Sequence, residues 1–170
     1  NVIDANHYPL PQIAELSQLR NELKLTGVGL VPAAVVAWSG DSLHPALTIN
    51  RGARHGLFPG LVAVRGFNLV GQLSDVSPTA ATVRLVTAAQ TSLVVMIVPP
   101  NDSHQPRRLM TQLRAAPEHN EFWASINTDD TVETGDLAYL MDDGWPEASR
   151  GFVVGTVVQI DKDPDDPILR

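Results

Sequence analysis

The chain has 170 residues, of which 44% are hydrophobic, and its formal net charge is −7 with a sequence pI near 5.0. That length fits one ordinary domain or two small ones, and the hydrophobic content excludes wholesale disorder. Nucleic-acid affinity depends on clustered Lys and Arg, so the acidic balance argues against a nucleic-acid partner. The chain has no cysteine, which excludes thiol catalysis and disulfide bonds.

No run of about 18 apolar residues occurs, so the chain as given is not expected to cross a membrane. A signal peptide is not recognisable either, and the sequence begins at Asn1 instead of Met. We therefore interpret the chain as a fragment or a processed product.

The first periodic segment is helical. Residues 1–11 are polar and contain two prolines, and we expect them to be extended or mobile. Between Gln12 and Leu25, apolar residues recur at steps of three and four, which predicts an amphipathic helix with its apolar side at Ile13, Leu16, Leu19 and Leu23. The same positions suit the seam of a two-stranded coiled coil or a short helix packed on its own domain, and the pattern does not choose between the two.

From Val31 onward, short apolar runs rich in Val, Leu, Ile and Thr predict β-strands. The connections are brief and leave no room for helical crossovers, so a barrel or sandwich is favoured. Residues 99–120 break this rhythm and fit either a helical turn or an irregular strand. The expected strands are Ala33–Trp38, Ala46–Asn50, Leu61–Arg65, Asn68–Val76, Ala81–Thr87, Ser92–Val98, Glu121–Asn127, Leu137–Met141 and Phe152–Asp161.

Glycines punctuate the strands. Glycine reaches positive φ at no steric cost and allows close approach of another backbone, so glycines between β-branched strands indicate tight turns. The predicted structural turn glycines are Gly52, Gly56, Gly60, Gly71, Gly135 and Gly155.

One segment resembles an enzyme motif. The strand before Gly40-Asp41-Ser42-Leu43 resembles the nucleophile block of GDSL hydrolases, in which Ser42 would be the nucleophile. That family takes its base from an Asp-x-x-His near the C-terminus, whereas no His follows His119 here. A serine without an oriented imidazole is a poor nucleophile, so an ordinary turn is the favoured interpretation.

Metal and cofactor motifs are missing from the sequence. The five histidines never fall at the spacings typical of a metal site, and neither a P-loop nor a G-x-G-x-x-G is present. We expect no cofactor, no metal site and no catalytic residue.

The order of glycines and apolar positions resembles the periplasmic β-domain of the bacterial rod-shape-determining MreC family. The family pattern L-T-I-x-x-G-x-x-x-G-V-x-x-G-x-x-V is similar to the segment Leu47–Val64, and L-V-G-x-V-x-x-V-S is similar to Leu69–Ser77. Later, V-x-x-G-D-L is similar to Val132–Leu137, and G-x-P-V-G-x-V to Gly151–Val157. The resemblance covers some 60% of the chain.

The resemblance implies two small six-stranded-type β-barrels preceded by a short N-terminal helix, the end of a coiled coil. The expected division is an N-terminal segment at 1–30, a first barrel at 31–77 plus 150–170, and a second barrel at 78–149. It further implies a periplasmic location, with an upstream transmembrane helix outside this chain. The implied role is a non-catalytic scaffold of the cell-wall elongation machinery, in peptidoglycan synthesis, that contacts penicillin-binding proteins and membrane components.

Self-association into a homodimer or filament is also implied, and we expect the helix residues Ile13, Leu16, Leu19 and Leu23 to carry it. Two alternatives stay open. One is a generic β-barrel adaptor that binds peptides on a strand edge, and the less favoured one is a GDSL-type serine hydrolase that uses Ser42.

Overall fold

The computed structural model describes residues 29–39, 41, 43–100, 108–116, 120–127, 129–161 and 168–169. These residues form strands and two short 3₁₀ turns, η2 (Ala53–His55) and η3 (Glu147–Ser149). The strands are β1 (Val35–Trp38), β2 (Ala46–Ile49), β3 (Val62–Arg65), β4 (Asn68–Val76), β5 (Ala81–Leu85), β6 (Ser92–Val98), β7 (Leu109–Ala116), β8 (Glu121–Trp123), β9 (Ile126–Asn127), β10 (Leu137–Leu140), β11 (Val153–Thr156) and β12 (Ile168–Leu169).

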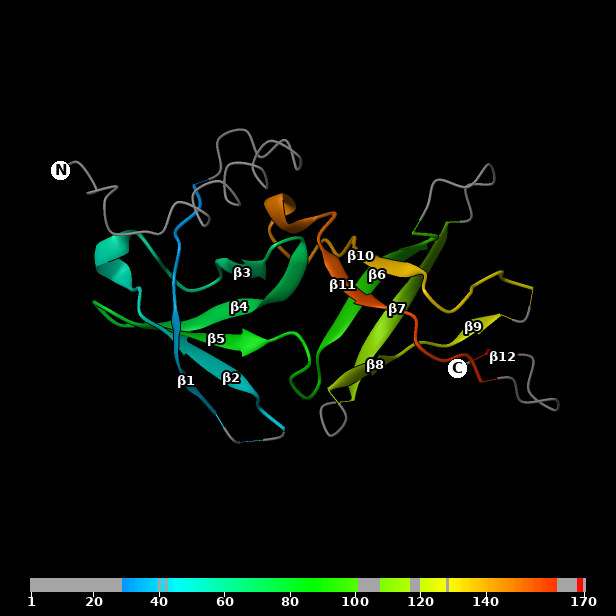
Figure 1. Ribbon diagram of the computed structural model, residues 1–170, viewed down its shortest axis with the longest axis horizontal. Helices are drawn as coiled ribbons and strands as arrows, with labels where there is room; N and C mark the ends of the chain where they lie inside the picture. Colours follow the sequence, from blue (N-terminus) through cyan, green and yellow to red (C-terminus); the bar gives the residue numbers. More distant parts are fainter. Residues whose placement is uncertain are drawn as a thin grey trace. The chain divides into compact units, whose positions relative to one another are not determined.

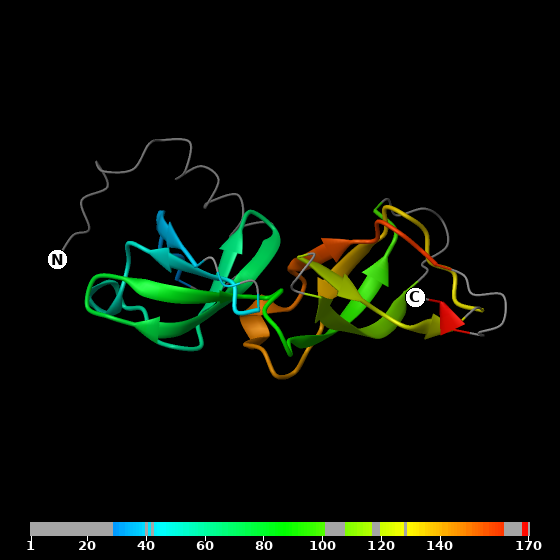
Figure 2. The ribbon, with the colours of Figure 1, turned by 90° about the horizontal axis from the view of Figure 1, so that it is seen from below.

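Ten of these strands form one sheet in the order β1-β2-β5-β4-β11-β10-β6-β7-β8, with β3 paired to β4 off this path (Figure 1). Neighbours in this sheet are antiparallel except for β4 and β11, which pair in parallel with Val153 opposite Asn68. A second, two-stranded sheet consists of β9 and β12, and β12 is the red arrow near the C-terminus in Figure 2.

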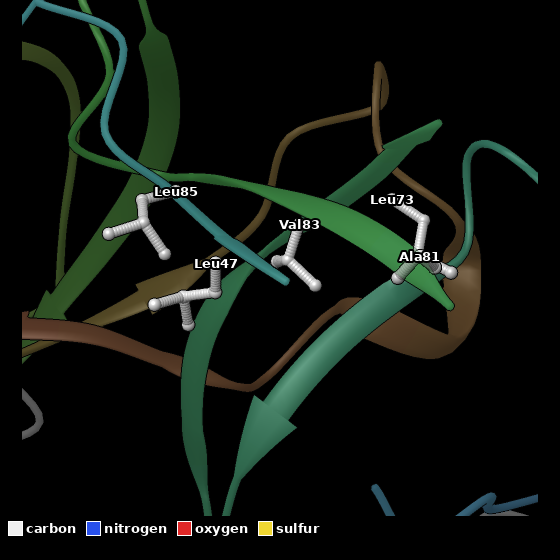
Figure 3. Close-up of a cluster of buried hydrophobic side chains, with 5 residues drawn as sticks. All are labelled: Leu47, Leu73, Ala81, Val83 and Leu85. Atoms are coloured by element: carbon white, nitrogen blue, oxygen red, sulfur yellow. The ribbon is translucent and has the colours of Figure 1, made fainter. Parts of the chain in front are cut away.

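Two sets of buried side chains hold the sheet. The first consists of alternating residues on β2, β4 and β5, drawn in Figure 3: Leu47, Leu73, Ala81, Val83 and Leu85. The second follows the matched registers of β6, β7 and β10, where Leu93 lies opposite Leu113 and Val95 lies opposite Leu140. Residues directly opposite one another share a face, so these strands bury one common side.

The predicted mostly β architecture is confirmed. Closure of a barrel requires its end strands to pair, and in the described residues the sheet instead ends at β1 and β8 without closing. The description as two closed barrels is therefore not confirmed. The predicted helix at 12–25 lies outside the described residues, and the predicted barrel limits stay a prediction.

Segment 109–116, which the sequence left undecided, is a strand, because β7 pairs with β6 over six residues from Leu109 to Arg114. The predicted strand Glu121–Asn127 is divided into β8 and β9, which pair with different partners. No helix in the part of the chain that the structure describes is both long and apolar enough to cross a membrane.

Candidate interaction surface

The strand β1 forms one end of the ten-stranded sheet and pairs only with β2 among the described residues. All four of its side chains are exposed, and the exposed fractions of Val35, Val36 and Trp38 are 57%, 59% and 66%. The outer edge of such a strand presents unpaired backbone N–H and C=O groups, to which another strand can add. We name the residues Val35–Trp38 the β1 edge surface and treat it as the candidate interaction surface.

A bulge sets the direction of the side chains on β1. Val35 lies opposite Ile49, Ala37 lies opposite Thr48, and the register shifts between the two pairs. Val36 is therefore an extra residue without a direct partner on β2. An extra residue of this kind changes which face the following side chains occupy.

Because of the bulge, two large side chains of β1 share one face of the sheet. Val35 lies opposite Ile49 and Trp38 lies opposite Leu47, and directly opposed residues point to the same face. Leu47 belongs to the first buried cluster, and Ile49 packs against that cluster. The core-facing side of the sheet thus continues onto β1, where it ends in two exposed apolar side chains.

The backbone around β1 is firmly attached to β2. The N–H of Ala34 donates to Asn50 Oδ1 at 2.8 Å, and the carbonyl of Ala34 accepts from the Asn50 N–H at 3.0 Å. At the other end, the Ser39 N–H donates to the Ala46 carbonyl at 2.8 Å. These bonds fix both ends of a strand whose own side chains gain little from burial.

The β1 edge surface is electrically neutral. No charged residue occurs between Gly29 and Ser39, in a chain whose formal net charge is −7. The other end of the sheet differs, because β8 begins with Glu121 and its Trp123 lies opposite Arg114 of β7. Charged side chains on an edge strand discourage pairing with further strands, so β8 is the better protected end.

The loop between β1 and β2 contains a local carboxylate–imidazole pair. Asp41 Oδ1 accepts from the N–H of Leu43 at 2.9 Å and of His44 at 3.2 Å, and Asp41 Oδ2 lies 3.2 Å from His44 Nδ1. The backbone N–H of Leu43, then that of His44, lowers the pKa of Asp41 from its ordinary value. Asp41 and His44 have Asp-x-x-His spacing, a signal that was present in the sequence and was missed.

This pair does not resemble a buried catalytic relay. The side chains of His44 and Asp41 are 69% and 52% exposed, and Asp41 is mainly occupied by the turn's own backbone. Ser42, the predicted nucleophile of the hydrolase alternative, lies outside the described residues. Among the residues that the structure does describe, no three His, Asp or Glu side chains gather where they could hold a metal ion.

Two of the six predicted glycines permit close approach of another backbone segment. A Cβ at Gly71 would lie 2.1 Å from the Arg84 carbonyl oxygen, and one at Gly52 would lie 2.1 Å from that of Ser77. Gly56, Gly60 and Gly135 have positive φ, whereas Gly155 does not and has open space around it.

Self-association was predicted for a different part of the chain, the N-terminal helix. Ile13, Leu16, Leu19 and Leu23 all lie outside the described residues. The β1 edge surface was not predicted, because an apolar run in a predicted strand is usually interpreted as part of the hydrophobic core. Its signal is the uncharged stretch that continues from Gly29 through the strand to Ser39.

An open-ended sheet with an apolar edge strand defines a β-rich domain, and the comparisons with known proteins specify its family. The family model for the barrel core of the rod shape-determining protein MreC matches residues 35–170. The chain therefore belongs to the MreC family, and the resemblance found in the sequence is confirmed. None of the curated protein sequences matches the chain significantly.

Solved structures share this fold. The crystal structure of MreC from Pseudomonas aeruginosa superposes with a TM-score of 0.67 at 20% identity, covering 84% of this chain and 88% of that one. Another MreC structure has a TM-score of 0.68 at 21% identity and covers 94% and 87% of the two chains. The major periplasmic domain of the cell shape-determining filament MreC has a TM-score of 0.52 at 19% identity and covers 84% and 87%. At these identities the likeness concerns the fold alone.

Proposed function

We propose that this chain is the extracytoplasmic part of a self-associating, non-catalytic scaffold that determines cell shape within the bacterial cell-wall elongation machinery. The observation that carries the proposal is the family match over residues 35–170. A structural relative described as a periplasmic domain and as a cell shape-determining filament supports both the location and the self-association. An anchor upstream of Asn1 belongs to this proposal.

The proposed contacts follow the family. Copies of the chain associate through a helical seam at Ile13, Leu16, Leu19 and Leu23, while the β-domain, proposed as barrels at 31–77 plus 150–170 and at 78–149, contacts penicillin-binding proteins and membrane components. Apolar residues at steps of three and four give a helix one continuous apolar face, which supports the proposed seam. The end of a coiled coil next to a β-domain also fits a role in peptidoglycan synthesis in which the protein positions its partners and catalyses no reaction.

Sedimentation velocity over a concentration series tests the proposal. The intact chain is expected to associate. Leu19→Glu is expected to weaken this association, because it places one carboxylate from each copy in an apolar seam. Gln18→Glu is the matched control, since it adds the same charge outside that seam. An intact chain that stays monomeric at every concentration contradicts the scaffold and favours an adaptor that binds an extended peptide.

The hydrolase alternative has its own measurement. A fluorophosphonate probe reacts with activated serines, and we expect no labelling of Ser42, because its neighbouring imidazole at His44 is exposed and held by a turn carboxylate. Labelling that is lost in Ser42→Ala would contradict the non-catalytic assignment.

A further inference from the structure

We propose that the β1 edge surface pairs with the same strand of a second copy, in antiparallel orientation, so that the two sheets become continuous. This inference rests on the proposed self-association and assigns a second interface to it, separate from the helical seam. The occupant is another copy of this chain, and the register places Val35 of one copy opposite Trp38 of the other.

Two apolar side chains at the margin of the core-facing side remain exposed in the part of the chain that the structure describes. Val35 and Trp38 lie on the core-facing side of the sheet, yet they are 57% and 66% exposed. A two-fold axis perpendicular to the sheet keeps the two core-facing sides together, so each Val35 meets the Trp38 of the second copy. Pairs of an aromatic and a β-branched residue across neighbouring strands are favourable, and this register forms two of them.

The distribution of charge also favours a second copy as the partner. A copy of the chain carries the same formal net charge of −7, so copies repel one another at most contacts. The stretch Gly29–Ser39 contains no charged residue, and strand pairing there brings no like charges face to face. A charged peptide, by contrast, would find no opposite charge on β1 to pair with.

The backbone hydrogen bonds of β1 and its flanking residues define the register of the proposed pairing. The hydrogen bonds of Ala34 with Asn50, and of the Ser39 N–H with Ala46, point toward β2. In the proposed register Ala34 and Ser39 lie opposite one another, and as inward-directed residues they form a non-hydrogen-bonded pair. Such pairs have the shortest separation in an antiparallel ladder, with Cα atoms about 4.5 Å apart.

Two isologous interfaces on one chain have a consequence for assembly. Each two-fold contact alone closes into a dimer, whereas two different ones joined through each copy produce an open chain of copies. The helical seam and the β1 edge surface together therefore predict a filament, and the loss of either one predicts a dimer.

Site-directed disulfide formation tests the register, since the natural chain has no cysteine. Two single variants of the intact chain, Ala34→Cys and Ser39→Cys, are oxidised separately and as a mixture. The opposed pair lies within the Cα range of about 4.4–6.8 Å that a disulfide needs, whereas identical positions lie five residues apart along the strand, about 16 Å. We expect cross-linked dimers in the mixture and at most a trace in each variant alone.

A charge substitution provides the independent measurement. Trp38→Lys places a positive charge from each copy in the proposed interface. It is measured in the intact chain that also carries Leu19→Glu, so that the helical seam is weakened and the β1 contact dominates. We expect the dimer dissociation constant of this chain to rise at least tenfold. Trp123→Lys is the matched control on the opposite end of the sheet, where an exposed Trp is replaced in the same way. Circular dichroism checks that both variants are folded.

The outcomes separate this inference from the proposed function. Association of the intact chain without mixed cross-links, or with equal sensitivity to Trp38→Lys and Trp123→Lys, overturns the β1 pairing and leaves the scaffold in place. Cross-links in each variant alone overturn the register. A chain that never associates overturns both.

Discussion

Asp142 Oδ2 accepts a hydrogen bond of 2.8 Å from the backbone N–H of Val94, a residue 48 positions earlier in the chain. Asp142 Oδ1 accepts a second bond of 2.8 Å from the N–H of Gly144. One carboxylate thus joins the start of β6 to the turn that follows β10, two strands that are neighbours in the sheet.

We expect Asp142→Ala to lower the free energy of unfolding by about 1–3 kcal/mol, because it leaves two backbone donors without their acceptor. Asp143→Ala is the control, since Asp143 is exposed and its ion pair with Arg150 lies at the surface, a contact worth about 0–1 kcal/mol. Chemical denaturation measures both. Equal losses in the two variants would show that Asp142 contributes nothing beyond a surface charge.

Gly71 lies where β4 crosses close to β5. We expect Gly71→Ala to destabilise the fold by about 1–3 kcal/mol or to prevent folding, because the new Cβ would overlap the Arg84 carbonyl oxygen, a backbone atom that cannot turn aside. Gly155→Ala has open space and should stay within about 0.5 kcal/mol of the parent. Thermal unfolding followed by circular dichroism tests the pair, and a destabilised Gly155→Ala would contradict the expectation.

Leu93 is completely buried in the second cluster, whereas Leu43 is 48% exposed in the loop before β2. Leu93→Ala is expected to cost about 2–5 kcal/mol through lost transfer energy and the cavity that remains. Leu43→Ala removes the same atoms from a side chain that is half in water, and we expect a change under about 1 kcal/mol. Urea unfolding measures the midpoint of each variant. Equal decreases of the two midpoints would contradict the expectation.

The Asp41 turn predicts a local pH dependence. The folded-state pKa of Asp41 is lowered, so the carboxylate stabilises the turn at pH values above its unfolded pKa and loses that contribution as pH falls through the folded pKa. In an NMR titration, the amide signals of Leu43 and His44 should shift with a midpoint below the ordinary aspartate range. Asp41→Asn should abolish that shift, and an unchanged curve in this variant would assign the shift to another group.

Local sequence predicted much of this fold. The ranges expected for β4 and β6, Asn68–Val76 and Ser92–Val98, are the observed ones, because both segments are bounded by turn residues and contain Val, Leu or Ile at alternating buried positions. The segment of β7 was undecided, since Leu109, Met110 and Leu113 also fit a helical turn. Only its pairing with β6 makes it a strand, and pairing between distant segments leaves no mark on local periodicity.

The candidate surface was less predictable for a related reason. The sequence of β1 is as apolar as that of a core strand. The exposure of its side chains follows from its position at the end of the sheet, which the sequence alone does not reveal. The turn pair Asp41 and His44 was available from spacing alone and was overlooked. The helix residues proposed for self-association were found by periodicity, and they stay a prediction.

The parallel contact between β4 and β11 also bears on how the chain folds. Asn68 already pairs with β3 on one edge, so Val153 pairs on the edge that β5 also uses further along β4. During synthesis β1 to β5 emerge long before β11, and the part of β4 near Asn68 then has no neighbour on that edge. Non-local parallel pairing forms slowly, so this step is expected to come late. A nascent or truncated chain that ends before Val153 therefore exposes a temporary second edge, and its tendency to aggregate should fall once residues 153–156 have been made.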